Sequence, residues 1–149
     1  MRLSEHFTLQ ELCRSDKAAA QGISNIPSVD TIAKLKILCD KILEPIREFF
    51  NIPFSPNSGY RSPEVNELVG GSKKSSHMKG EAADIEIPGV SNYNLATWIK
   101  NHLDFDQLIL ENYEIGNPSS GWVHVSYTNK NRNQTLTYTG GQYISGLIL

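Results

Sequence analysis

The amino-acid sequence predicts an α+β fold in which N-terminal helices pack on a small, mainly antiparallel sheet. Helix caps and apolar residues at three- and four-residue steps dominate the first part of the chain, and short runs of alternating residues dominate the last part. At 149 residues the chain is expected to form one domain, 1–149. A chain of this size buries about 70% of its unfolded surface, so it can build a core without disulfides.

Capping signals predict two short helices at the N-terminus. Thr8 followed by Glu11 forms a capping box, and the helix that it begins is expected to end near Ser15. A second brief helix, DKAAAQ, is expected to stop at Gly22, a residue type that suits the left-handed position after a helix.

The longest helix is expected to begin at Ser28, which serves as its N-cap. Its apolar residues recur at helical spacing and form one stripe for burial: Val29, Ile32, Leu35, Leu38, Ile42, Ile46 and Phe49. Pro45 is expected to bend or interrupt this helix near its end, because proline lacks the backbone N–H and crowds the preceding turn.

Shorter elements complete the predicted fold. An extended segment over 51–61 leads into a short helix over 62–68, and a further helix is expected over 91–102. Alternating side chains predict strands in four segments, the last of which ends at a Gly140-Gly141 turn: EAADIEI (81–87), FDQLILE (105–111), GWVHVSY (121–127) and QTLTYT (134–139).

Composition excludes several classes of protein. The net charge is −2, which argues against a nucleic-acid binder with a basic face. No stretch approaches the roughly 20 apolar residues of a membrane span, and the first residues lack the apolar core of a secretory signal. Cys13 and Cys39 are too few for a disulfide framework and are expected to be buried free thiols, which favours synthesis in a reducing cytoplasm.

Two histidines and one aspartate are expected to meet on one face of the sheet. Alternation directs Ala83, Ile85 and Ile87 into the core, so Asp84 lies on the opposite face. The same rule directs Val123 and Val125 inward and His124 outward. His77 precedes Asp84 in a loop with glycines on both sides, which lets the chain fold back over the strand.

This set matches a catalytic zinc site, in which three nitrogen and oxygen ligands leave one position open for water. Zinc lowers the pKa of a bound water to about 7. The same spacing also fits a loop histidine at His77 and an ordinary strand histidine at His124, so the pattern alone leaves both interpretations open.

A zinc peptidase also needs a carboxylate that takes a proton from water and passes it to the leaving amine. Glu111 ends a predicted strand, and Glu114 follows it in a loop, so Glu111 is the preferred candidate and Glu114 the alternative. Arg61 supplies a guanidinium that can hold a substrate carboxylate or stabilise an oxyanion.

Other residues near these positions are candidates for substrate binding. Tyr60 and Trp122 either line the cleft or pack in the core, and Ser58 and Ser75 either contact substrate or fix their loops. Three lysines around the mouth of the predicted site are solvated loop residues or attract an acidic wall polymer: Lys73, Lys74 and Lys79.

The segment SSHMKGEAAD carries the pattern Ser75-x-His77-x-x-Gly80-x-Ala82-x-Asp84. This resembles the signature of the zinc D-Ala-D-Ala carboxypeptidase family, which shares its fold with the hedgehog signalling domain and includes phage L-alanyl-D-glutamate endolysins. The likeness extends through SGYRSPEVNELVGG, FDQLILE, WVHVSY and NRNQTL, as well as HFTLQEL near the N-terminus, and resembles a phage or prophage branch.

The resemblance implies that His77, Asp84 and His124 bind one zinc ion and that Arg61 meets the substrate. In several relatives the catalytic acid stands only a few residues before the last histidine, whereas position 121 of this chain is glycine. The loop NYEIGNPSSG separates Glu111 from His124, so the choice between Glu111 and Glu114 stays open.

The leading hypothesis is a monomeric zinc peptidase that cuts the stem peptide of peptidoglycan, either as a D-Ala-D-Ala carboxypeptidase or as an L-Ala-D-Glu endopeptidase. The absence of a secretory signal fits a lysin that is made in the cytoplasm and acts on the wall after release. Neither nucleic acid nor membrane insertion is expected. The alternative is a non-catalytic, zinc-containing module that recognises the cell wall or a protein.

Overall fold

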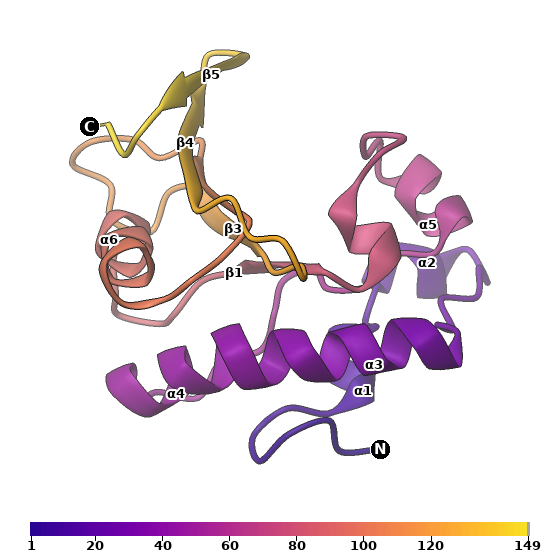
Figure 1. Ribbon diagram of the computed structural model, residues 1–149. Helices are drawn as coiled ribbons and strands as arrows, with labels where there is room; N and C mark the ends of the chain where they lie inside the picture. The colour runs from indigo at the N-terminus through magenta and orange to yellow at the C-terminus, as the bar shows by residue number, and fades with distance from the viewer. Residues whose placement is uncertain (149) are drawn as a thin grey trace.

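A computed structural model describes residues 1–148 and contains one five-stranded sheet. The helices are α1 (Leu9–Leu12), α2 (Asp16–Ala20), α3 (Val29–Leu38), the π-helix η1 (Cys39–Leu43), α4 (Glu44–Phe50), α5 (Pro63–Leu68), the 3₁₀-helix η2 (Ser76–Lys79) and α6 (Asn92–His102). The strands are β1 (Ala82–Ile85), β2 (Gln107–Glu111), β3 (Trp122–Ser126), β4 (Gln134–Thr139) and β5 (Gln142–Ser145). In Figure 1 the long helical run of α3 and α4 passes below the sheet and α6 lies beside it.

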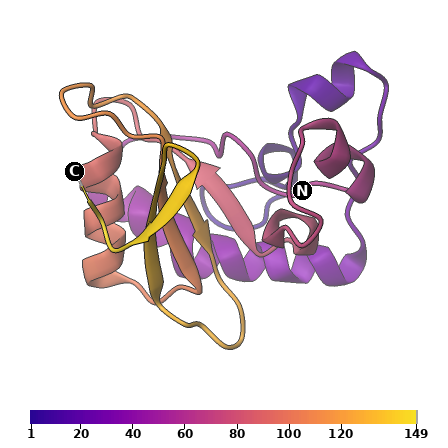
Figure 2. The same cartoon turned by 90° about the horizontal axis from the view of Figure 1, so that it is seen from above.

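The sheet has the strand order β1-β3-β2-β4-β5. β2 and β4 are parallel and the other neighbouring pairs are antiparallel. The predicted fold class is therefore confirmed. Seen from above, the sheet and α6 lie toward one end of the molecule, and α2 and α5 gather at the other (Figure 2).

The capping predictions are confirmed. Thr8 and Glu11 form the reciprocal capping box of α1, and Ser28 accepts a hydrogen bond from the backbone of Thr31 at the start of α3. Ser62 and Ser91 cap α5 and α6 in the same way. These local signals need no tertiary contact to act, which explains why they can be identified from sequence.

Pro45 was predicted to bend or interrupt the long helix, and the helical run is not broken there, although it changes from α to π geometry just before Pro45. The backbone passes from α3 through η1 into α4 as one run, and Pro45 lies in the first turn of α4 (Figure 1). In η1 the N–H of Glu44 reaches back to the carbonyl of Cys39. This wider π-turn relieves the clash that proline causes with the carbonyl of the preceding turn.

The predicted apolar stripe is buried along its middle and exposed at both ends. Leu35, Leu38 and Ile42 are fully covered, whereas Val29 and Phe49 are 82% and 59% exposed. The side chains that the alternation rule directed inward are also buried in this core, four of them in the sheet and Ile87 just after β1: Ala83, Ile85, Ile87, Val123 and Val125. Ala82 is buried as well, although it points to the other face.

The two cysteines differ in burial. Cys39 is buried in the core as predicted, and this burial raises the pKa of its thiol to about 12. Cys13 is only partly buried, at the end of α1, and burial raises its pKa to about 11. Both thiols are free and stay protonated at neutral pH, so neither fits a nucleophile.

Two strand predictions need correction in detail. β1 is shorter than the predicted segment 81–87, and β5 follows the Gly140-Gly141 turn although no strand was expected there. Among the described residues, no helix is both long and apolar enough to cross a membrane.

The extended segment 51–61 runs beside the outer edge of β1. The backbone of Asp84 accepts a hydrogen bond from Asn57 N and donates one to the carbonyl of Ser58, both at 2.8 Å. This short bridge places Ser58, Gly59 and Arg61 against the face of the sheet that carries Asp84.

Candidate metal centre

Three potential metal ligands converge where β1 meets β3. Asp84 lies directly opposite His124 in the strand register, and Nδ1 of His124 is 3.0 Å from Oδ1 of Asp84. His77, buried in η2, places its Nε2 3.3 Å from the same oxygen. The structure thus brings together the two histidines and the aspartate that the sequence singled out.

The spacing of these atoms suits a tetrahedral ion. Two donors that each lie about 2.1 Å from tetrahedral zinc are about 3.4 Å apart. The two contacts to Asp84 come close to this separation, and the three ligand atoms all lie within 4.8 Å of one another. The donor set of two imidazoles and one carboxylate is also one that zinc accepts.

A backbone contact orients His77. Its Nδ1 lies 2.7 Å from the carbonyl oxygen of Gly59, which can only accept, so Nδ1 carries a proton and Nε2 is the ring atom that faces Asp84 and would bind a metal. The ring is placed by η2, whose N-cap Ser75 accepts a hydrogen bond from the backbone N–H of His77. η2 was not predicted, and Gly80 ends it in a left-handed conformation.

Asp84 is ionised in this arrangement. Burial on its own would raise the pKa of the carboxyl, but hydrogen bonds with His124 and His77 and the charges of the two rings hold the pKa well below its ordinary range. A carboxylate that binds a metal must be deprotonated, so this environment prepares Asp84 as a ligand.

Arg61 is held on the second oxygen of Asp84. Its Nη2 lies 3.4 Å from Oδ2 of Asp84, its Nε donates to Oγ of Ser58 at 3.0 Å, and its Nη1 donates to Oδ1 of Asn66 at 3.3 Å. Asn66 was not a candidate in the sequence. Its importance shows in its burial, because Asn66 is a polar residue of α5 that is only 4% exposed.

Glu111 shares the face of the sheet that carries His124. Ile109 lies opposite His124 in the register, so Glu111, two residues further along β2, points to the same side. Its Oε2 accepts a hydrogen bond of 2.8 Å from the indole N–H of Trp122. Burial, and then the charge of Asp84, raise the pKa of the Glu111 carboxyl despite opposing contributions from its neighbours.

The family model described as Peptidase M15 matches residues 5–126 of this chain. The chain belongs to the M15 peptidase family. It is a zinc-dependent peptidase, as the resemblance of the signature segment implied. The comparison with curated proteins returned no match.

The two candidates for the general base lie in different surroundings in this M15 peptidase. Glu111 lines a cleft of about 640 Å³ together with His77, Asp84 and His124. Glu114 is exposed in the loop after β2, where its backbone N–H donates to Oγ of Ser120 at 2.6 Å, and it is not among the described residues that line the cleft. The geometry therefore favours Glu111.

The glycine at position 121 has a structural cause. Gly121 has a φ of +67°, and a Cβ at this position would lie 2.0 Å from the carbonyl oxygen of Glu111. The backbone of the loop after β2 packs directly against the backbone before β3. No side chain fits here, so this peptidase cannot carry its catalytic acid at position 121.

We expect Gly121→Ala to lower the free energy of unfolding by about 2–4 kcal/mol. The alanine would have to adopt a left-handed backbone conformation, and its Cβ would overlap the carbonyl oxygen of Glu111. Urea denaturation measures the change. Gly116→Ala is a matched control in the same loop, since Gly116 has a φ of +85° and open space around it. Its expected cost is only about 1 kcal/mol, because the left-handed backbone is then the only penalty. Equal losses in the two variants would contradict the packing explanation.

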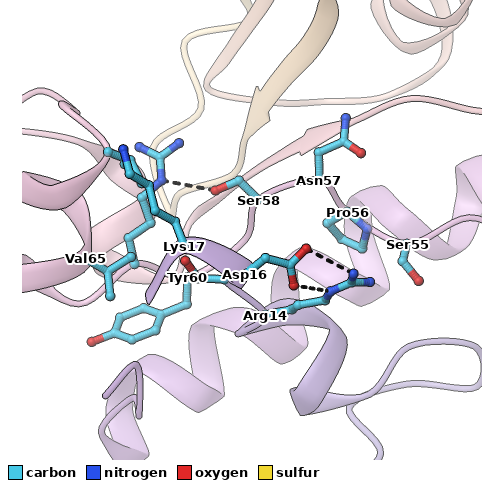
Figure 3. A pocket seen from close by; sticks show the side chains of 12 residues that line it. Arg14, Asp16, Lys17, Ser55, Pro56, Asn57, Ser58, Tyr60 and Val65 are labelled. Atoms are coloured by element: carbon cyan, nitrogen blue, oxygen red, sulfur yellow. Dashed lines mark hydrogen bonds and ion pairs between the residues drawn. The ribbon is translucent and has the colours of Figure 1, made fainter. Parts of the chain in front are cut away.

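The remaining substrate candidates divide between two hollows. Ser75 and Trp122 line the cleft that holds the three ligands. Ser58 and Tyr60 line a neighbouring hollow of about 450 Å³, which Figure 3 shows from close by, and Arg61 borders both. Lys74 and Lys79 also line the main cleft.

Proposed function

We propose that this peptidase hydrolyses a peptide bond in the stem peptide of bacterial peptidoglycan, with His77, Asp84 and His124 as the ligands of one zinc ion. The observation that carries the proposal is the convergence of the three donors at zinc spacing within the cleft that also contains Glu111. The two bonds under consideration are D-Ala-D-Ala and L-Ala-D-Glu. An endolysin-like role in a phage or prophage fits the resemblance of the chain.

A zinc ion in this site would polarise the scissile carbonyl and acidify a water in its open position. Glu111 takes one proton from the water, whose oxygen adds to the carbonyl carbon. Glu111 then gives this proton to the amine nitrogen as the C–N bond breaks. Its raised pKa suits a group that must both accept and donate a proton near neutral pH.

Arg61 is proposed to hold a carboxylate of the substrate. Three of its five N–H groups are used by Ser58, Asn66 and Asp84, which leaves two N–H groups to donate. Ser75 and Trp122 are proposed to contact the substrate from the walls of the cleft. A longer substrate would extend into the neighbouring hollow beside Ser58 and Tyr60.

The test is a mass-spectrometric digest of purified peptidoglycan with and without a zinc chelator. We expect a product that the chelator abolishes and that added zinc restores, because the proposed reaction depends on the metal. The mass of the product identifies the bond. Well-folded, zinc-loaded protein that releases no product from several wall types would contradict the proposal.

A further inference from the structure

A row of side chains crosses four strands beside the proposed metal centre. The strand register places Trp122 opposite Glu111, Glu111 opposite Tyr138, and Tyr138 opposite Tyr143. Directly paired residues point to the same face of a sheet, so the whole row shares the face of His124. The two tyrosines therefore continue the surface that carries the proposed general base.

The two tyrosines form an aromatic wall of the cleft. Their ring centroids are 4.6 Å apart at an interplanar angle of 53°, and both line the cleft that holds the three ligands. The ring of Tyr143 has little other packing, because the residue is 60% exposed. Burial and the charge of Glu111 both raise the pKa of Tyr143, which is consistent with a position close to the base.

This wall lies outside the part of the chain that defines the family. The matched residues end at 126, whereas β4 and β5 span 134–145. In Figure 1 the β4–β5 hairpin rises at one end of the sheet, and α5 with the loop after it rises beyond β1 at the other end. From this second end, Lys74 in that loop and Arg61, which precedes α5, contribute cationic groups to the cleft.

The two sides suit different chemical groups. Arg61 and Lys74 favour carboxylates, which the stem peptide supplies through its glutamate and its C-terminus. Tyrosine rings favour a partner with an apolar face and a polar edge. The alanine and glutamate side chains of the stem peptide offer no large apolar face, whereas the amino sugar at its N-terminus has a C–H face and a rim of hydroxyl and amide groups.

We propose that Tyr138 and Tyr143 bind the amino sugar that bears the stem peptide. This inference rests on the proposed function and adds the direction in which the substrate lies. The sugar contacts the hairpin, and the peptide beyond the scissile bond runs toward Arg61.

The width of the sheet can be compared with the reach of the substrate. Neighbouring strands are about 4.8 Å apart, so Tyr138 and Tyr143 lie about 10 and 14 Å from the strand of His124. An extended residue spans at most about 3.5 Å, so one alanine and the lactyl link place the start of the sugar ring at most about 7 Å from the scissile carbonyl, and four residues and the link place it at most about 17 Å away. The wall lies between these two limits and is compatible with either bond.

The experiment compares two substrates, a muramoyl peptide that contains the L-Ala-D-Glu bond and the same peptide with an acetyl group in place of the sugar. We expect the wild-type enzyme to prefer the muramoyl peptide in kcat/KM. Tyr143→Ala is expected to reduce this preference about five- to tenfold, through KM rather than kcat, because the contact is made before and during the reaction alike. Tyr143→Phe should retain most of the preference.

Phe49→Ala is the matched control, because Phe49 is a 59% exposed aromatic residue on α4 and does not line the cleft. It should keep the preference of the wild type. An unchanged preference in Tyr143→Ala, or equal losses on both substrates, would overturn the inference and leave the peptidase activity standing.

A binding experiment tests the aromatic wall separately if the protein does not hydrolyse these peptides. If neither peptide is cut, a calorimetric titration with muramoyl-L-Ala still measures binding to the wall. Weaker binding in Tyr143→Ala than in the wild type and Phe49→Ala would support the aromatic wall. Equal binding in the three proteins would overturn it.

Discussion

Replacing His124 with alanine is expected to abolish zinc binding and hydrolysis together. Even a residue that only orients a metal ligand contributes about 10- to 100-fold to metal affinity, so loss of one of three ligands should cost more than about a hundredfold. The remaining donors, His77 and Asp84, cannot hold the ion in a fixed geometry. The loss follows from position, because Nδ1 of His124 is 3.0 Å from Oδ1 of Asp84.

Metal content after dialysis and the rate of peptide hydrolysis measure the two effects of His124→Ala. His102→Ala is a suitable control, because His102 is an exposed histidine at the end of α6 and belongs neither to the lining of the cleft nor to the clusters of potential ligands among the described residues. It should keep both zinc and activity. Full activity in His124→Ala would exclude His124 as a ligand, and loss of both properties in the control would indicate a nonspecific effect.

The second large effect is expected from Glu111→Gln, which should keep zinc and lose turnover. Glutamine retains an oxygen that can accept the hydrogen bond from the indole of Trp122, so the side chain should stay in place. It cannot accept a proton from water. Because general acid–base catalysis contributes about 10²–10⁴-fold, we expect kcat to fall by that factor at unchanged zinc content.

Glu114→Gln separates the two candidate bases. Glu114 is exposed and its backbone, rather than its carboxylate, is tied to Ser120, so this variant should turn over like the wild type. Single-turnover kinetics with zinc-loaded protein make the comparison. A large loss in Glu114→Gln with little change in Glu111→Gln would show that the loop, and not β2, supplies the base.

Local rules account for the part of the site that could be predicted. Alternation along a strand places Asp84 and His124 on one face without any knowledge of the rest of the fold. The convergence of His77 follows from a tight turn between it and Asp84. These residues are close in sequence or lie in regular elements, so their geometry depends little on distant contacts.

The residues that orient the ligands could not be predicted in this way. The carbonyl of Gly59 meets His77 from a separate segment of the chain, and the amide of Asn66 holds Arg61 from the helix that follows it, and neither residue type signals such a role. The parallel pairing of β2 with β4 places Tyr138 beside Glu111, and strand pairing of this kind depends on the whole chain. The missed π-turn before Pro45 has the same cause, because propensity rules treat proline as a break and ignore how the surrounding helix adapts.

The extended segment 51–61 limits where the chain of this enzyme can tolerate insertions. It supplies the Gly59 carbonyl to one ligand, the Ser58 hydroxyl to Arg61, and the bridge to the backbone of Asp84. An insertion here would displace all three contacts at once. The connection over 112–121 ends in the close-packed Gly121 but bulges into solvent at its tip, where Gly116 has open space around it. The chain can therefore change length at this tip without disturbing the metal centre. A change of length in the segment beside β1 would disrupt it.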